Sequence, residues 1–131
     1  MYQVVTELPL ERAPGTVWHY STADTQLLGI ALEAAIGEPL SDYASEKLWI
    51  PLGAEQDALW SLEFGAETIK SGCCFSSTAR DFARLGQLVL QNGEWNGEQL
   101  VPADYLETAV QSIRGIPTAE GERVTYYGYQ F

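Results

Sequence analysis

The most continuous apolar segment of the chain predicts a helix over residues 22–36. Ser21 and Thr22 are residue types that commonly cap a helix N-terminus, and Asp24 follows in the first turn, where it favours the helix dipole. Apolar side chains then occupy nearly every side of this helix, so we expect it to be buried all round. Gly37 is expected to end it, because glycine readily adopts the left-handed conformation that closes many helices.

Three further segments have helical patterns. Pro39 and Ser41 open a helix that extends to about Trp49, where Pro51-Leu52-Gly53 ends it. The clearest apolar stripe lies in a helix that Ser77 or Thr78 caps and that ends at Gln91; its members are Phe82, Leu85 and Val89. Pro102 is expected to start a fourth helix over about 103–112.

The remaining segments predict turns and short extended pieces. Trp60, Leu62 and Phe64 alternate with other residues as in a strand, although residues 54–69 stay ambiguous. Ser71-Gly72-Cys73-Cys74 predicts a tight loop, and Tyr126–Phe131 is aromatic-rich and strand-like. The pattern therefore predicts a mainly α chain with short strand-like segments at its ends.

Charge narrows the range of partners. The 131 residues include 18 acidic and 7 basic side chains, for a formal net charge of −11. Such a chain repels phosphate backbones and lacks a basic face for anionic lipid, so we expect neither a nucleic-acid nor a membrane partner. No apolar run approaches the ~18 residues of a membrane span, and residues 1–10 do not resemble a signal peptide. The compartment stays unknown, because the true N-terminus of the protein could lie elsewhere.

The sulfur and imidazole side chains are few. Cys73 and Cys74 are adjacent, and because adjacent cysteines rarely bridge comfortably, we expect a pair of small buried thiols. A single histidine, His19, with two neighbouring cysteines makes a poor zinc site, so no metal site is expected. A sharper alternative makes Cys73 a nucleophile with His19 as its base, but nothing in the sequence brings the two together.

Several motifs in order resemble one enzyme family. The segment from Pro14-Gly15-Thr16 to Tyr20-Ser21-Thr22, followed by Leu27-Leu28-Gly29 and later by Ser77–Gly86, is similar to the serine β-lactamase and DD-peptidase superfamily. Trp49–Gly53 and Asp57–Trp60 look most like its 6-aminohexanoate-dimer-hydrolase and esterase branch. The resemblance covers about residue 12 to the end. It implies that residues 1–131 form one partial domain, the helical subdomain of an α+β fold.

The resemblance also implies a chemistry. In the family, the serine of a Ser-x-x-Lys motif attacks an amide or ester, and a tyrosine near the lysine takes the serine proton. Tyr20 stands at the position of that tyrosine, although the family form is Tyr-x-Asn and this chain has Thr22 in place of the asparagine. The chain contains no Ser-x-x-Lys, and by the resemblance it is expected to stop before the family's late Lys/His-Ser/Thr-Gly strand. We therefore expect a piece of a serine hydrolase that is inactive alone. The resemblance also implies that no metal or organic cofactor is needed.

Four further residues are expected to line the cleft: Thr22, Gly72 and Cys73 by the same resemblance, and Trp60 from its position after the Pro51-Leu52-Gly53 turn. The substrate of the full-length parent would be a small-molecule amide or ester. Self-association is expected through the side of the subdomain that the sheet would otherwise cover. The alternative is a non-catalytic binding or interaction module derived from the same fold.

Overall fold

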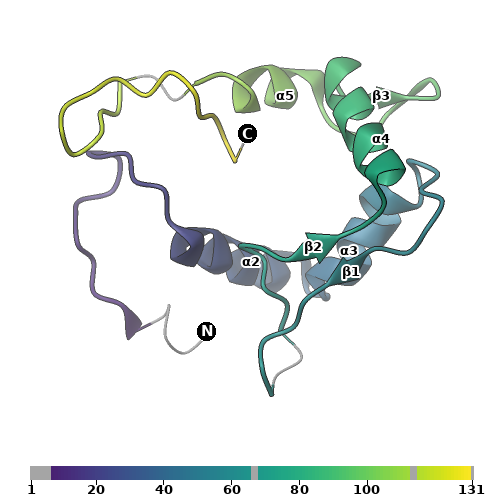
Figure 1. Cartoon of the computed structure of the whole chain (residues 1–131), viewed down its shortest axis with the longest axis horizontal. Helices are drawn as coiled ribbons and strands as arrows, with labels where there is room; N and C mark the ends of the chain where they lie inside the picture. The colour runs from purple at the N-terminus through teal and green to yellow at the C-terminus, as the bar shows by residue number, and fades with distance from the viewer. Residues whose placement is uncertain (1–6, 66–67, 113–114, 131) are drawn as a thin grey trace. The chain divides into compact units, whose positions relative to one another are not determined.

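Helices dominate the computed structural model, which describes residues 7–65, 68–112 and 115–130 (Figure 1). Along the chain the elements are α2 (Thr22–Ile36), α3 (Leu40–Ala44), η1 (Ser45–Trp49), β1 (Leu59–Trp60), β2 (Phe75–Ser76), α4 (Ala79–Leu90), β3 (Glu94–Trp95), β4 (Glu98–Gln99) and α5 (Ala103–Ala109). The mainly α prediction is confirmed. The described strands lie in the middle of the chain and not at its ends.

The chain divides into two compact units. The first unit is built from Met1–Leu8 and Ser21–Leu88, and the second combines Pro9–Tyr20 with Val89–Phe131. The interpretation of residues 1–131 as one partial domain stays a prediction. Each unit is described by itself below.

Helix α2 begins and ends where the sequence predicts. The Ser21 hydroxyl accepts a hydrogen bond from the Asp24 N–H at 3.2 Å, and Gly37, with φ 76°, donates its N–H to the Glu33 carbonyl at 2.9 Å. The prediction of burial all round is wrong for this chain. Gln26 and Gly29 are buried, whereas Leu28 is 59% exposed. An apolar face of α2 therefore remains in water.

The second predicted helix is two kinds of helix in succession. Helix α3 starts after Pro39, and the N–H of Leu40 donates to the Glu33 carboxylate at 3.0 Å. The chain then widens into the π-helix η1, where the Ile50 N–H reaches the Ser45 carbonyl five residues back. Leu52 follows as one of the most deeply buried apolar side chains of the first unit, at 1% exposed.

Two short antiparallel sheets complete the architecture. In the first unit, Leu59 pairs with Ser76 and Trp60 with Phe75, and a further bridge joins Leu62 to Ile69. In the second unit, β3 and β4 form a hairpin whose turn residues, Asn96 and Gly97, both have positive φ. That geometry is the one that an Asn-Gly dipeptide predicts.

The C-terminal segments differ from the prediction. Helix α5 ends at Ala109, three residues before the predicted end, and residues 126–130 form no strand. The Tyr129 N–H instead donates to the Ala109 carbonyl at 2.8 Å, so this segment is tied to the end of α5. Phe131, the last residue of the predicted strand, lies outside the described residues.

Candidate functional site

Tyr20 belongs to an aromatic cluster in the second unit. Its ring lies edge to face with Tyr127, at 5.7 Å between centroids, and Trp18 contacts both Tyr126 and Tyr127 in the same manner. The Trp18 N–H donates to the Pro117 carbonyl at 2.8 Å, which anchors the segment that carries the cluster. The Tyr20 side chain is 63% exposed. Its phenol is thus held from one side by aromatic rings and accessible to solvent.

The neighbouring phenol in this cluster is electrostatically perturbed. Burial, and to a smaller extent the nearby Tyr20, raises the pKa of Tyr127 above its ordinary value. Tyr127 therefore keeps its proton at neutral pH. Its hydroxyl donates to the Gln130 side-chain amide oxygen at 3.2 Å.

Thr22 and Gly72 lie against each other in the first unit. A Cβ atom added to Gly72 would lie 2.8 Å from both the Thr22 methyl group and the Thr22 carbonyl oxygen. The loop that contains Gly72 is also tied to α2 by the Ser71 hydroxyl, which donates to the Thr25 carbonyl at 3.3 Å. Only a glycine permits this close approach, so the Gly72 position carries a structural requirement in addition to its predicted place near the cleft.

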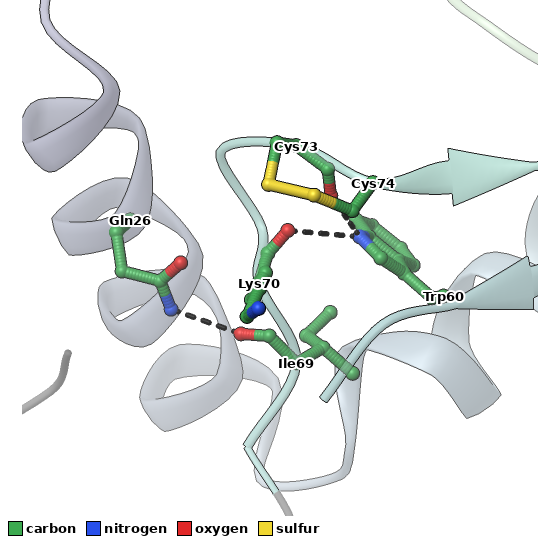
Figure 2. The surroundings of a disulfide bond; sticks show 6 residues. All are labelled: Gln26, Trp60, Ile69, Lys70, Cys73 and Cys74. Atoms are coloured by element: carbon green, nitrogen blue, oxygen red, sulfur yellow. Dashed lines mark hydrogen bonds between the residues drawn. A yellow bond between two sulfur atoms is a disulfide. The ribbon is translucent and has the colours of Figure 1, made fainter. Parts of the chain in front are cut away.

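A buried amide makes a second connection between this loop and α2. Gln26 is 1% exposed, and its Nε2 donates to the Ile69 carbonyl at 2.9 Å (Figure 2). A helix position that the sequence pattern assigns to an apolar core is therefore used for a polar contact. The sequence gives no periodic signal for it: Gln26 follows Asp24 and Thr25 and stands just before the apolar run that begins at Leu27.

Trp60 and Cys73 are brought together directly. The indole N–H of Trp60 donates to the carbonyls of Lys70, at 3.0 Å, and Cys73, at 3.1 Å (Figure 2). The Trp60 ring also lies edge to face with Phe75 at 5.3 Å. Trp60 thus closes the loop between β1 and β2 and fixes the backbone of Cys73.

The prediction of two buried thiols is wrong. Cys73 and Cys74 are both exposed, and their sulfur atoms are bonded to each other (Figure 2). Cys74 has φ 69°, in the left-handed region, so the backbone turns sharply between the two residues instead of directing their side chains to opposite sides as a strand would. A bonded sulfur is not a nucleophilic thiolate, which removes Cys73 as a nucleophile in this state.

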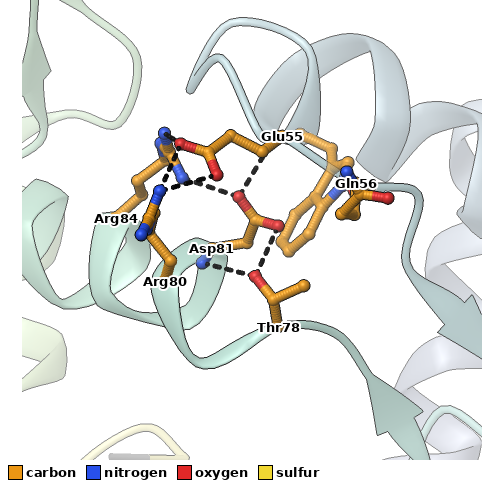
Figure 3. A network of polar contacts seen from close by, with 7 residues as sticks. Glu55, Gln56, Thr78, Arg80, Asp81 and Arg84 are labelled. Carbon is orange, nitrogen blue, oxygen red and sulfur yellow. Dashed lines mark hydrogen bonds and ion pairs between the residues drawn. The ribbon is translucent and has the colours of Figure 1, made fainter.

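A polar network joins the start of α4 to the loop before β1 (Figure 3). The Asp81 carboxylate is 1% exposed and accepts from the Glu55 N–H at 2.8 Å, from Arg84 at 2.7 Å and from the Thr78 hydroxyl at 2.8 Å. Glu55 pairs in turn with Arg84 at 2.8 Å and with Arg80 at 3.2 Å. The Thr78-x-x-Asp81 spacing signals a capping box, but the sequence analysis missed Glu55.

The charges of this network favour its ionised form. The Glu55 N–H, assisted by Thr78 and Arg84, lowers the pKa of the Asp81 carboxyl group against the opposing effect of burial. The Arg84 guanidinium lowers the pKa of Glu55, and Glu55 raises that of Arg84. The Asp81–Arg84 pair is largely buried: the Asp81 side chain is 0% exposed and the Arg84 side chain is 21% exposed. The network stabilises the fold around the loop.

Metal chemistry finds no support among the described residues. Within 7–65, 68–112 and 115–130, no group of three or more His, Cys, Asp or Glu side chains is arranged to hold a metal ion. Among the helices of these same ranges, none is long and apolar enough to cross a membrane.

Comparisons with known proteins give the family. The β-lactamase family model matches residues 1–131. The chain is 28% identical over 109 residues to 6-aminohexanoate-dimer hydrolase from Paenarthrobacter ureafaciens, a match that covers 83% of this chain and 27% of that protein. A shorter match, 39% identical over 51 residues, covers 39% of this chain and 12% of an Escherichia coli K12 protein described as "putative D-alanyl-D-alanine carboxypeptidase".

Solved structures agree with this assignment. A Bacillus anthracis protein described as "putative 6-aminohexanoate-dimer hydrolase" superposes with a TM-score of 0.86 at 29% identity, covering 98% of this chain and 33% of that one. A Bacteroides dorei protein described as "putative beta-lactamase" gives a TM-score of 0.77 at 21% identity over 92% of this chain and 37% of that one, which shows the fold. The chain thus spans about a third of these structures. It belongs to the β-lactamase family of hydrolases.

Proposed function

We propose that this chain is part of a serine hydrolase that cleaves an amide or ester through a serine acyl-enzyme. The observation that carries the proposal is the position of Tyr20: an exposed phenol, held by Tyr127, that directly precedes the capped N-terminus of α2. Family membership and the hydrolase names of the relatives support the reaction class. The substrate is a small-molecule amide or ester.

In this proposal Tyr20 moves protons. Its oxygen accepts the proton of the attacking serine and returns it to the leaving group. A phenol with an ordinary pKa of about 10 is a weak base at neutral pH, so an adjacent cation must favour the phenolate. In the family, the lysine of Ser-x-x-Lys supplies that cation, and the serine of the same motif is the nucleophile. This chain contains no such motif, so the nucleophile has to come from sequence outside it.

Thr22, Gly72, Trp60 and Cys73 would then form a wall of the cleft. Thr22 is exposed at the first residue of α2, and Gly72 packs directly on it. Trp60 holds the loop through the carbonyl of Cys73. These contacts make the wall one connected piece of structure, suited to binding a substrate in a fixed orientation.

A serine-directed probe tests whether the chain acts alone. We expect no mass increase when the chain is incubated with a fluorophosphonate, because none of its serines is followed three residues later by the lysine that would activate it. A stoichiometric adduct would mean that the chain contains its own activated nucleophile, and the role given to Tyr20 would be wrong.

A second candidate function is a non-catalytic interaction module. It is favoured by the apolar face of α2, where Leu27, Leu28 and Leu32 are between 38% and 59% exposed. Exposed leucines in register on one helix make a surface suited to another apolar surface, including a second copy of this chain. A module of this kind would self-associate in a concentration-dependent way and would show no hydrolytic activity in any longer form.

A further inference from the structure

The disulfide between adjacent cysteines is the feature that the proposed hydrolysis leaves unused. Cys73 and Cys74 are the chain's two cysteines, they are bonded to each other, and both side chains are exposed. We propose that they form a reversible redox site that exchanges with low-molecular-weight thiols and disulfides. This inference does not depend on the identity of the hydrolysed substrate.

Exposure makes the site accessible to such reagents. Thiol–disulfide exchange requires a thiolate to approach one sulfur in line with the sulfur–sulfur bond, so a buried bridge reacts slowly. Here the bridge joins two exposed residues that directly precede β2 (Figure 2). A small thiol can therefore reach it without unfolding of the chain.

The backbone of the loop is held by contacts other than the disulfide. The Cys73 N–H donates to the Lys70 carbonyl at 3.0 Å, and the Cys74 carbonyl accepts from the Ser61 N–H at 3.1 Å. Trp60 adds its hydrogen bond to the Cys73 carbonyl. Because the two backbone bonds, to the Lys70 carbonyl and from the Ser61 N–H, persist when the bridge opens, the two thiols stay neighbours after reduction. Ring closure is then favoured over reaction with an external thiol, since the entropy of bringing the sulfurs together has already been lost.

The exchange balances in two steps. In reduction, a small thiolate attacks one cysteine sulfur, the sulfur–sulfur bond breaks, and the other cysteine leaves as a thiolate that takes up a proton. A second small thiolate then attacks the small-molecule sulfur of the mixed disulfide. This step releases a small-molecule disulfide and the second cysteine as a thiolate, which also takes up a proton. Oxidation runs the same steps in reverse. Two electrons pass between the cysteine pair and the thiol couple.

Reduction of the bridge is expected to affect the surrounding loop as well as the two sulfur atoms. The loop that contains it is packed on the first turns of α2 through Gly72 and Ser71, and on β1 through Trp60. Cys74 in the left-handed conformation belongs to the oxidised loop. Because non-glycine residues disfavour this conformation, reduction permits Cys74 to relax from it and thereby to change the hydrogen bonds of Trp60. Trp60 fluorescence is consequently a reporter of the redox state.

The experiment equilibrates the chain with graded ratios of reduced and oxidised glutathione without oxygen, quenches with acid and alkylates the remaining thiols. Intact mass then counts the alkyl groups. We expect wild type to pass from two alkyl groups to none, with the internal bridge exceeding the mixed glutathione disulfide by about tenfold or more. Cys73→Ser and Cys74→Ser have one thiol each, so they are expected to accumulate the mixed disulfide instead.

Two further readouts decide between this site and ordinary surface thiols. Reduced wild type should bind one phenylarsine oxide per chain through both sulfurs, with loss of one water, whereas neither serine variant should retain it after a monothiol wash. The tryptophan fluorescence of the chain should change with the glutathione ratio in wild type and should not change in Trp60→Phe. Accumulation of two glutathione adducts, or of disulfide-linked dimers in place of the internal bridge, would overturn the proposal.

Discussion

The side-chain amide of Gln26 donates to the backbone carbonyl of Ile69 at 2.9 Å, and this bond connects α2 to the loop that contains Gly72 and Cys73. Both partners are buried, Gln26 at 1% and Ile69 at 5% exposed. The bond is therefore shielded from water, and the carbonyl would lose its partner if the amide were removed. It fixes the segment after Tyr20 to one wall of the proposed cleft.

Replacing this amide should destabilise the first unit. Gln26→Met retains most of the side-chain volume and removes the donor, so the buried Ile69 carbonyl is left unpaired. We expect a loss of about 1–3 kcal/mol in the free energy of unfolding, measured by urea titration. Gln87→Met, at an exposed position of α4, is the matched control and should change the stability by less than about 0.5 kcal/mol. Equal effects of the two substitutions would refute the role assigned to Gln26.

The network around Asp81 predicts how stability depends on pH. The pKa of Asp81 is lowered chiefly by the Glu55 N–H, and that of Glu55 chiefly by Arg84. A carboxyl group with a lowered folded pKa contributes stability that is fully present above its unfolded pKa. That contribution is lost as the pH falls through the folded value. Stability from these groups should thus be constant above about pH 5 and decrease below about pH 4.

The thermal midpoint measured from pH 7 to pH 2 tests this dependence. Asp81→Asn should lower the midpoint at pH 7 and flatten the decrease at low pH, because the substituted side chain cannot ionise. Asp57→Asn, an exposed carboxyl group outside the network, should follow the wild-type curve. An Asp81→Asn curve that runs parallel to wild type would show that the network does not govern the acid response.

Two helical glycines should respond to alanine with opposite signs. Gly86 in α4 has open space where a Cβ would lie, so Gly86→Ala should stabilise by about 0.5–1 kcal/mol through its higher helix propensity. Gly29 in α2 packs against the Ser71 side chain, and an added Cβ would collide with both Cβ and Oγ of Ser71. Gly29→Ala should therefore destabilise, and Ser71→Gly in the same chain should recover part of the loss in a urea titration.

The exposed face of α2 predicts self-association. Leu28 is 59% exposed, so Leu28→Glu should weaken concentration-dependent association in light-scattering chromatography and leave the free energy of unfolding nearly unchanged. Leu52 is 1% exposed, and Leu52→Ala should cost about 2–5 kcal/mol of stability without reducing association specifically. Unchanged association of Leu28→Glu would show that this face of α2 is not the contact surface.

The sequence predicted the helix ends and the turns well, because each depends on residues close together in the chain. Ser21 and Gly37 bound α2 through contacts within a few residues, and the Asn96-Gly97 turn depends only on its own backbone angles. Gln26 and Glu55 were missed because their partners lie 43 and 26 residues away in sequence. No periodicity reports such pairs. The strand expected at Tyr126–Phe131 does not form at the described residues 126–130 for the same reason, since the Tyr129 N–H bonds to Ala109 instead of to a neighbouring strand.

The sequence also predicted part of the candidate site, namely its loop, but not the contacts or the disulfide within it. The sequence placed Gly72 and Cys73 in a tight loop, and the structure adds that Trp60 and Thr22 contact that loop. The bond between Cys73 and Cys74 was not foreseen, because its formation depends on the left-handed backbone at Cys74. A residue other than glycine or asparagine seldom signals that conformation in a sequence.

The central claim, that Tyr20 transfers the proton, is tested most directly in a chimera. This chain would replace the segment of the Bacillus anthracis relative on which it superposes with a TM-score of 0.86, so that the rest of the fold surrounds it. Hydrolysis of a p-nitrophenyl ester would be compared among the chimera, its Tyr20→Phe variant and a Tyr126→Phe control from the same aromatic cluster. We predict that Tyr20→Phe lowers kcat by about 10²–10⁴ and that Tyr126→Phe changes it little. Equal activity of the chimera and its Tyr20→Phe variant would contradict the account.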